Sequence, residues 1–217
     1  MSSHHFVKEG QEPALIIANG QECAYTLLSQ LLEWCPFVVV LDGAYKRVKD
    51  LQIKPDIVIG DFDSLPEIHR DEDVQFIKLE EQETTDLEKA ISHLKDIGYT
   101  DINVVWATGK RLDHTINNFS ILGKNADLNI VLYDDYSRAF ALPKTYKKHY
   151  ATKFKLSLFP MGEVSGIKTS NLAYNLDDES LKMGGRSGSS NWVQEDGIVE
   201  IKHDKGTLIL IESKDEI

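Results

Sequence analysis

The chain has 217 residues, of which 41% are hydrophobic and 27% are charged. A chain of this composition can bury a core, which excludes an intrinsically disordered protein. Its 35 acidic residues outnumber its 24 lysines and arginines, so the formal net charge is −11. Because such a charge repels a phosphate backbone, we expect no nucleic-acid partner.

The cysteine content and the hydropathy pattern indicate the compartment. The two cysteines, Cys23 and Cys35, fall in or beside one predicted helix, so we expect no disulfide framework and a reducing environment. No apolar run approaches the length of a membrane span, and the first residues do not resemble a signal peptide. We therefore expect a cytoplasmic protein without a membrane partner.

The first half of the chain alternates between strand and helix patterns. Apolar runs at residues 14–18, 37–41 and 57–59 and a weaker run at 76–79 are typical of strands, and helices are expected around residues 27–32 and 45–51. This alternation predicts a parallel sheet with right-handed crossovers. The second run ends on Asp42 and Gly43.

The third run leads directly into Gly60-Asp61-Phe62-Asp63. Ligands of open α/β sheets bind at the carboxyl ends of the strands. Mg²⁺ takes carboxylates together with substrate phosphates, so Asp61 and Asp63 are candidate metal ligands. The alternative is a solvated turn before a helix, because residues 64–67 have capping-box spacing.

Two further strand-to-helix junctions carry polar residues. Thr85 and Glu88 have capping-box spacing before an apolar stripe, which places Asp86 in the first helical turn as a metal ligand or as a simple complement to the helix dipole. A strand at 103–107 precedes Arg111, whose guanidinium can fork onto phosphate oxygens. The helix after it is expected to turn Leu112, Ile116, Phe119 and Leu122 inward.

After a strand at 129–133 the pattern changes. Short alternating segments at 138–142, 154–159, 164–167, 198–201 and 207–211 predict a small antiparallel sandwich, with the boundary near residues 135–136. The small polar stretch 184–191 is either a linker or a substrate loop. Trp192 follows it, and its ring face suits a cationic or heteroaromatic ligand or packing in the core.

Five of these segments together resemble the thiamine pyrophosphokinase family. Residues 19–20, 42–44, 60–64, 82–86 and 109–114 occur in that family's order and spacing, and Ser189-Ser190-Asn191 resembles its C-terminal signature. The resemblance implies an enzyme that transfers diphosphate from ATP to the hydroxyl of thiamine with Mg²⁺, leaving AMP. It also implies an α/β Rossmann-like parallel-sheet domain (1–135) and an all-β sandwich domain (136–217) that binds thiamine and dimerises. The homodimer would share its active sites.

The resemblance also assigns roles to single residues. It makes Asp61, Asp63 and Asp86 the catalytic acids that hold Mg²⁺. The nucleotide-side residues that it implies are Asp42, Gly43, Arg111, Asp113 and His114. Those on the thiamine side are Gln82, Ser190, Asn191 and, as an addition to the motif, Trp192. Lys110 stands where many members have a glycine, and no Walker A motif occurs.

Two other functions fit part of the pattern. The segment 59–65 also resembles the aspartyl-nucleophile motif of haloacid-dehalogenase-type phosphatases, in which Asp61 would be phosphorylated. That reading leaves Asp86, the 111–114 segment and the C-terminal sandwich unused. A non-catalytic thiamine- or nucleotide-binding sensor is the other alternative, and a sensor does not need three acids.

Overall fold

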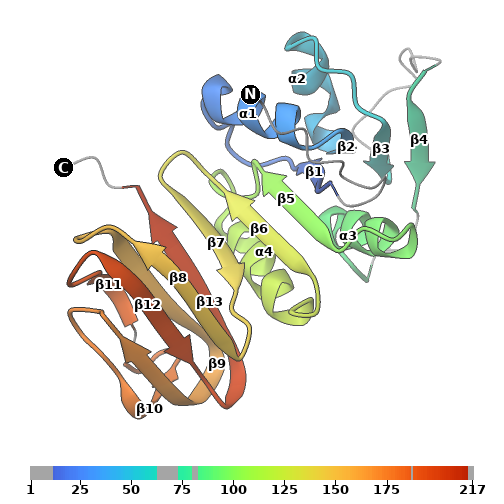
Figure 1. The fold of residues 1–217 in the computed structure, drawn as a ribbon. Coiled ribbons are helices and arrows are strands. Elements are labelled where there is room, and N and C mark those ends of the chain that lie inside the picture. Colours follow the sequence, from blue (N-terminus) through green and yellow to red (C-terminus); the bar gives the residue numbers. More distant parts are fainter. Residues whose placement is uncertain (1–11, 63–72, 80–82, 187, 215–217) are drawn as a thin grey trace. The chain divides into compact units, whose positions relative to one another are not determined.

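The computed structural model describes residues 12–62, 73–79, 83–186 and 188–214. These fall into two compact units, residues 1–118 and 119–217 (Figure 1). The division lies within helix α4 (Leu112–Lys124), earlier in the chain than the boundary expected near 135–136. β6 (Asn129–Tyr133) pairs antiparallel with β7 (Ser137–Ala141), and both strands lie in the second unit.

The first unit contains a parallel sheet with the strand order β4-β3-β2-β1-β5. The predicted strands of the first half are confirmed as β1 (Ala14–Ile17), β2 (Phe37–Leu41), β3 (Ile57–Gly60), β4 (Gln75–Lys78) and β5 (Asp101–Val105). In the register, Ile17 lies opposite Val40 and Val105. The strands therefore end together, and the residues after them gather at one edge of the sheet.

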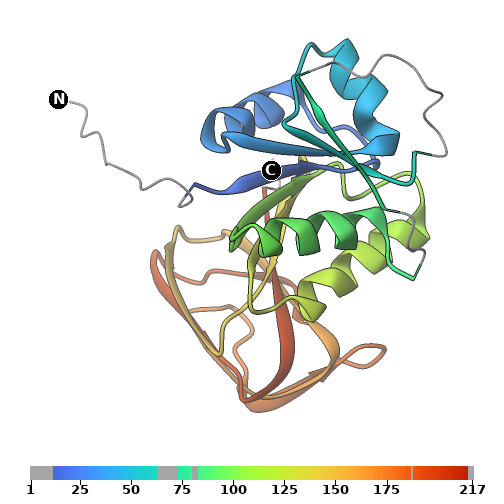
Figure 2. The same cartoon turned by 90° about the vertical axis from the view of Figure 1, so that its right-hand side faces the viewer.

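Helices cover both faces of this sheet. Figure 2 shows α1 (Tyr25–Trp34) and α2 (Tyr45–Asp50) on one face and α3 (Asp86–Asp96) on the other, and a short 3₁₀ helix (Asp42–Ala44) precedes α2. The predicted capping box of α3 is confirmed, because the Thr85 side chain accepts the Glu88 N–H and the Thr85 N–H donates to Glu88 Oε2 at 3.1 Å. Asp86 therefore occupies the first turn of α3.

One prediction about α4 is wrong. Leu112 and Ile116 do not turn inward; they are 77% and 65% exposed, whereas Leu122 is buried as expected. The inward position at this end of the helix is taken by Asn118, whose Nδ2 donates to the carbonyl oxygen of Ala107 at 2.7 Å. The buried Asn118 amide has its hydrogen-bond partner, and it faces inward at this end of α4, where the spacing of apolar residues predicted Leu112 and Ile116.

The second unit is antiparallel, with the order β6-β7-β13-β9-β12-β8 and with β10 and β11 also paired to β9. Its remaining strands are β8 (Thr145–Tyr150), β9 (Lys155–Ser170), β10 (Asp177–Lys182), β11 (Gly188–Trp192), β12 (Gly197–Lys202) and β13 (Lys205–Ser213). The separate strands predicted at 154–159 and 164–167 are one strand, β9. β8 and β10 were not predicted, and β11 replaces the linker or loop expected at the end of 184–191.

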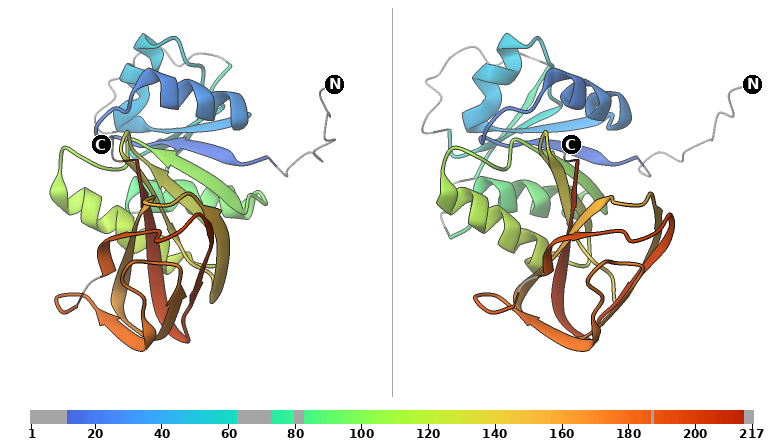
Figure 3. Two further views of the ribbon diagram at one scale, coloured as in Figure 1. Left: turned by 60° about the vertical axis from the view of Figure 1, so that its left-hand side comes forward. Right: turned by 90° about the vertical axis from the view of Figure 1, so that its left-hand side faces the viewer.

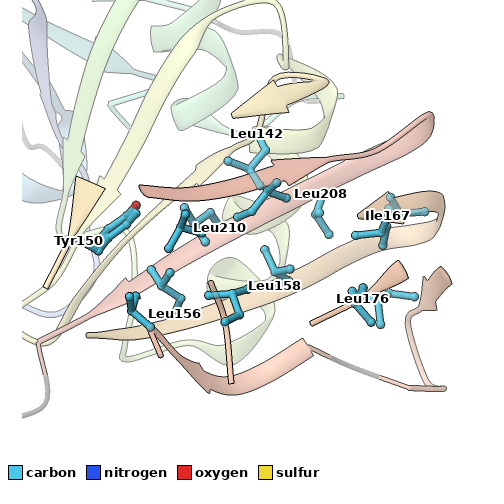
Figure 4. Close-up of a cluster of buried hydrophobic side chains, with 14 residues drawn as sticks. Leu142, Tyr150, Leu156, Leu158, Ile167, Leu176, Leu208 and Leu210 are labelled. Atoms are coloured by element: carbon cyan, nitrogen blue, oxygen red, sulfur yellow. The ribbon is translucent and has the colours of Figure 1, made fainter. Parts of the chain in front are cut away.

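These strands wrap around one interior (Figure 3). Buried side chains of alternate positions on β9 and β13, such as Leu156, Leu158, Leu208 and Leu210, point into it (Figure 4). The first half of β9 pairs with β13 and β11, and its second half pairs with β10 and β12. This long strand therefore contributes to the pairing on both sides of the core.

An ionic cluster lies among the strands of the second unit. The Glu212 carboxylate accepts from Arg138 Nε at 2.5 Å, Lys148 Nζ at 3.1 Å and the Tyr150 hydroxyl at 2.5 Å. Burial opposes the charge of Glu212, but the hydrogen bonds from Arg138 and Tyr150 outweigh it and lower the pKa of this carboxyl. The cluster connects β13 with β7 and β8.

The described strands thus form a mixed sheet, parallel in the first unit and antiparallel in the second, with few helices. None of the helices in the described ranges combines the length and the apolar character that crossing a membrane demands.

Candidate active site

A cavity of about 600 Å³ lies in the first unit at the edge where the parallel strands end. Its walls come from the residues after β1, β2, β3 and β5 and from the starts of α3 and α4. Five of the predicted site residues line it, namely Asp42, Asp61, Asp86, Arg111 and His114. The volume is in the range typical of small-molecule sites.

The other predicted residues lie elsewhere. Asp63 and Gln82 fall outside the described residues. Gly43 and Asp113 contact residues of the wall, since the Gly43 N–H donates to Asp42 and the Asp113 carboxylate accepts from Arg111. Ser190, Asn191 and Trp192 belong to the second unit.

Asp42 is buried, although it is a charged residue at the end of a strand. It is 6% exposed, and its carboxylate accepts the N–H of Gly43 at 2.5 Å and of Phe62 at 3.0 Å. Burial raises the pKa of this carboxyl, the hydrogen bond from Phe62 opposes the rise, and the charge of Asp86 adds to it. Phe62 has a φ of 62°, an unfavourable region for a large side chain. Asp42 therefore stabilises the strained residue beside Asp61.

Gly60 allows this arrangement by its lack of a side chain. A Cβ at this position would lie 2.2 Å from Asp42 Cγ. We predict that Gly60→Ala lowers the free energy of unfolding by about 1 to 3 kcal/mol, as overpacking does, because the Asp42 side chain is short and held by two backbone donors. Denaturant unfolding measures this. Gly185→Ala is the control, since its Cβ would approach no atom closer than 3.4 Å, and equal stability of the two variants would contradict the prediction.

Asp61 and Asp86 both present carboxylates to the cavity. The charges of both also raise the pKa of Asp42, so both lie within electrostatic reach of that carboxylate. The described residues contain no cluster of three or more His, Cys, Asp or Glu side chains that could hold a metal by itself. Mg²⁺, however, is usually bound by one or two carboxylates together with substrate phosphates. The two carboxylates therefore fit Mg²⁺ that arrives with a phosphate ligand.

Arg111 stands at the solvent side of the cavity. Its guanidinium forks onto the Asp113 carboxylate, with Nε 3.1 Å from Oδ1 and with a second contact from Nη2 to Oδ2. This pairing lowers the pKa of Asp113 to about 2. Both side chains are well exposed, at 70% and 63%. Because exposed ion pairs contribute little free energy, Arg111 can exchange Asp113 for a phosphate at small cost.

Sequence reasoning missed an arginine that organises the wall. Arg47 donates to the Gly20 carbonyl at 3.2 Å and to Asn19 Oδ1 at 2.7 Å, and its guanidinium carbon lies 4.6 Å from the centroid of the Trp106 ring. Trp106 has a φ of 57° and its carbonyl accepts the Gly20 N–H at 2.5 Å. Arg47 thus connects the residues after β1 and β5. No local sequence signal marks it, because its partners are distant in the chain.

Lys89 was missed as well, although it lines the cavity and is 8% exposed. Its spacing of three residues from Asp86 on a predicted helix was an available signal, because such pairs lie on the same face.

In the second unit, Asn191 uses its side chain to hold a neighbouring segment. Its Oδ1 accepts the N–H of Tyr174 at 3.1 Å and of Trp192 at 3.0 Å, and its Nδ2 donates to the Tyr174 carbonyl at 2.8 Å. The Trp192 ring meets the Tyr174 ring edge-on with centroids 5.2 Å apart. A cavity of about 230 Å³ beside it is lined by Tyr174, Ser189 and Asn191, among others.

Two family models match the chain. The model described as "Thiamin pyrophosphokinase, catalytic domain" matches residues 28–132. The model described as "Thiamin pyrophosphokinase, vitamin B1 binding domain" matches residues 145–208. The first includes the predicted acids, Arg111 and His114, and the second includes Ser190, Asn191 and Trp192.

Similar proteins carry the same name. Thiamine pyrophosphokinase 1 of Oryza sativa subsp. japonica is 32% identical over 165 residues, which are 68% of this chain and 62% of the rice protein. Thiamine pyrophosphokinase 2 of Arabidopsis thaliana is 28% identical over 240 aligned positions, covering 94% of this chain and 88% of that protein. The crystal structure of thiamin pyrophosphokinase from Geobacillus thermodenitrificans superposes with a TM-score of 0.80 at 25% identity, covering 94% and 98% of the two chains.

Proposed function

We propose that this chain, which belongs to the thiamine pyrophosphokinase family, transfers the diphosphate of ATP to the hydroxyl of thiamine and releases AMP. The observation that carries the proposal is the cavity at the carboxyl edge of the parallel sheet, whose wall contains the two carboxylates of Asp61 and Asp86 and the side chain of Arg111. Carboxylates that bind a metal ion and a guanidinium that binds phosphate oxygens are the groups that a metal–polyphosphate substrate needs. For the fold, we propose a Rossmann-like first domain and a β-sandwich second domain, which the strand pairings support.

In this reaction the thiamine hydroxyl oxygen bonds to the β-phosphorus of ATP while the bond from that phosphorus to the bridging oxygen of AMP breaks. The hydroxyl proton leaves to a base, and a carboxylate of the site is the candidate class. Asp61 and Asp86, together with Asp63, would hold Mg²⁺, which when bound neutralises phosphate charge. The role of the protein is then to position the reactants and to stabilise charge, because phosphoryl-type transfer needs little covalent help.

The nucleotide-side residues divide into two roles. Arg111 would exchange Asp113 for phosphate oxygens, and His114 in the first turn of α4 lines the same cavity. Asp42 and Gly43 would hold the backbone of the site in place, because the Asp42 carboxylate accepts the N–H groups of Gly43 and Phe62. We therefore propose that Asp42 shapes the ATP site without touching the nucleotide through its carboxylate.

The thiamine side would use the second unit, with Trp192 and Tyr174 as the aromatic surface for a cationic ring. Asn191 would position these rings, since its amide is bonded to their backbone. Ser190 is exposed, and its N–H donates to Ser157 Oγ at 3.0 Å. Its hydroxyl is therefore the group that we propose as a contact for the ligand's polar groups. Gln82 remains a proposed thiamine contact from the family resemblance.

The test is incubation with thiamine and MgATP, followed by separation of the products. Equimolar AMP and thiamine diphosphate are expected, with no product when EDTA is added. A haloacid-dehalogenase-type phosphatase with Asp61 as nucleophile would release inorganic phosphate instead. A non-catalytic sensor would bind either ligand without forming AMP.

We propose further that the active form is a homodimer with shared thiamine sites. The support is the family resemblance and the apolar surface of Leu112 and Ile116, which lie one helical turn apart on α4 and are both exposed. Each site would combine the first unit of one subunit with the second unit of its partner.

Subunit mixing tests this sharing. Asp61→Asn and Trp192→Ala homodimers are each expected to be nearly inactive. In a mixed dimer both lesions fall on one site and leave the other intact, so the isolated heterodimer should regain about half of the wild-type sites by symmetry. Native mass spectrometry confirms the exchange. A heterodimer as inactive as its parents, or an active monomer, would contradict sharing.

A further inference from the structure

Lys89 is a lysine in an unusual place. It lies in the first turns of α3, its side chain is 7% exposed, and it lines the cavity of the first unit. Lysine is almost never this buried unless its charge is paired, because taking an ammonium out of water is unfavourable. The buried Lys89 ammonium therefore needs hydrogen-bond acceptors or a negative charge close to it.

Among the described residues, the Lys89 ammonium has two hydrogen-bond acceptors, and both bonds are long. The Lys89 ammonium donates to the carbonyl oxygen of Leu79 at 3.3 Å and to Asp86 Oδ1 at 3.4 Å. Charge-assisted hydrogen bonds are usually near 2.7 to 2.9 Å, so both contacts are long. An ammonium has three N–H donors, and the part of the chain that the structure describes supplies acceptors for two. One donor is left at the wall of the cavity.

The surroundings of Lys89 suit an anionic ligand that arrives together with Mg²⁺. Asp42, Asp61 and Asp86 line the same cavity, and the exposed cations Lys110 and Arg111 lie toward solvent. Lys89 is thus the buried cation among the described residues of this wall. A positive charge in a partly desolvated site acts more strongly on a polyphosphate than an exposed one does. Because α3 holds the lysine in place, little ordering is needed on binding.

We propose that Lys89 is a catalytic residue whose third N–H donates to a non-bridging oxygen of the diphosphate that is transferred from ATP. The lysine gives a hydrogen bond and a charge; it transfers no proton. It would supply the cation that a Walker A lysine supplies elsewhere, on a chain that has no such loop. The proposal rests on the proposed function. The competing explanation is structural, with Lys89 holding only Leu79 and Asp86.

Lys89→Gln separates the two explanations. The glutamine amide keeps two N–H donors, on a side chain that is one atom shorter, but it lacks the charge and the third donor. Calorimetric titration with magnesium pyrophosphate, in the absence of thiamine, should show an affinity between about tenfold and a hundredfold lower than that of the wild type, as for a lost hydrogen bond to a charged group. Lys89→Arg should recover part of the affinity, and kcat for AMP formation should fall in parallel in Lys89→Gln.

Lys95→Gln is the matched control, because Lys95 is exposed on the same helix, and its affinity should stay within about twofold of wild type. Unchanged pyrophosphate affinity in a folded Lys89→Gln chain overturns the proposal. If that variant does not fold, nitrogen NMR of the lysine ammonium groups in the wild type decides. A Lys89 resonance that shifts on adding magnesium pyrophosphate supports the contact, and one that does not shift refutes it. Absence of AMP formation by the wild type would instead refute the proposed function, since the affinity measurement needs no turnover.

Discussion

Asp61→Asn is expected to reduce diphosphate transfer by about a thousandfold while leaving the fold intact. The carboxylate follows β3 at the edge of the sheet and lines the cavity, outside the hydrophobic core. Losing a metal-bound carboxylate removes several kcal/mol of charge stabilisation, and each 1.4 kcal/mol is about tenfold in rate. The measurement is AMP formation across a magnesium titration, together with a thermal melt.

Asp73→Asn is the control for that variant. Asp73 is an exposed acid paired with Lys54 at 3.1 Å, away from the cavity, so its turnover should equal that of the wild type. Near-normal turnover of Asp61→Asn at saturating Mg²⁺ would remove Asp61 from the metal site.

Asp86→Asn is the second variant with a large expected effect. Two roles compete for this residue, because it lies in the first turn of α3 and also lines the cavity. The dipole contribution of one acid is about 1 kcal/mol, and the Thr85–Glu88 capping box remains in the variant. The asparagine Oδ1 can still accept the Lys89 N–H that Asp86 Oδ1 accepts at 3.4 Å. The melting temperature should therefore change by only a few degrees, whereas turnover should fall at least about a hundredfold if Asp86 holds the metal.

Glu88→Ala gives the opposite pattern and is the matched control. Glu88 Oε2 accepts the Thr85 N–H in the capping box, so its loss should weaken α3 by about 1 kcal/mol and leave turnover near normal. An Asp86→Asn chain with reduced stability and intact turnover would show that Asp86 acts only as a helix-terminal charge.

The sequence predicted the parallel half of the fold well because its signals are local. Uninterrupted apolar runs such as residues 37–41 mark strands that are covered on both faces, and the spacing of Thr85 and Glu88 marks a helix start. Parallel strands joined by crossovers end at one edge, so the sequence predicts that Asp42, Asp61 and Asp86 lie together. The structure confirms that these three line one cavity.

The antiparallel half was predicted less completely because pairing there depends on distant partners. β8 and β10 read as polar segments, with sequences TYKKHY and DDESLK, and are strands because β12 and β9 pair with them. β11 is small and polar for a related reason. A Cβ on Gly188 would lie 2.9 Å from Leu158 Cβ of β9, so the close approach favours glycine. Composition that indicates a loop can therefore belong to a strand.

The sequence by itself determined the family, the alternation of strands and helices, and the positions of the acids at strand ends, because spacing along the chain carries all three. Only the tertiary structure decided how single side chains are used. Asp42 binds backbone N–H groups, Asn191 holds Tyr174, and Leu112 faces outward. Lys89 likewise became a candidate only when burial placed its ammonium beside Asp86 in the cavity wall. Burial and hydrogen-bond partners arise from contacts between distant segments, which no local pattern encodes.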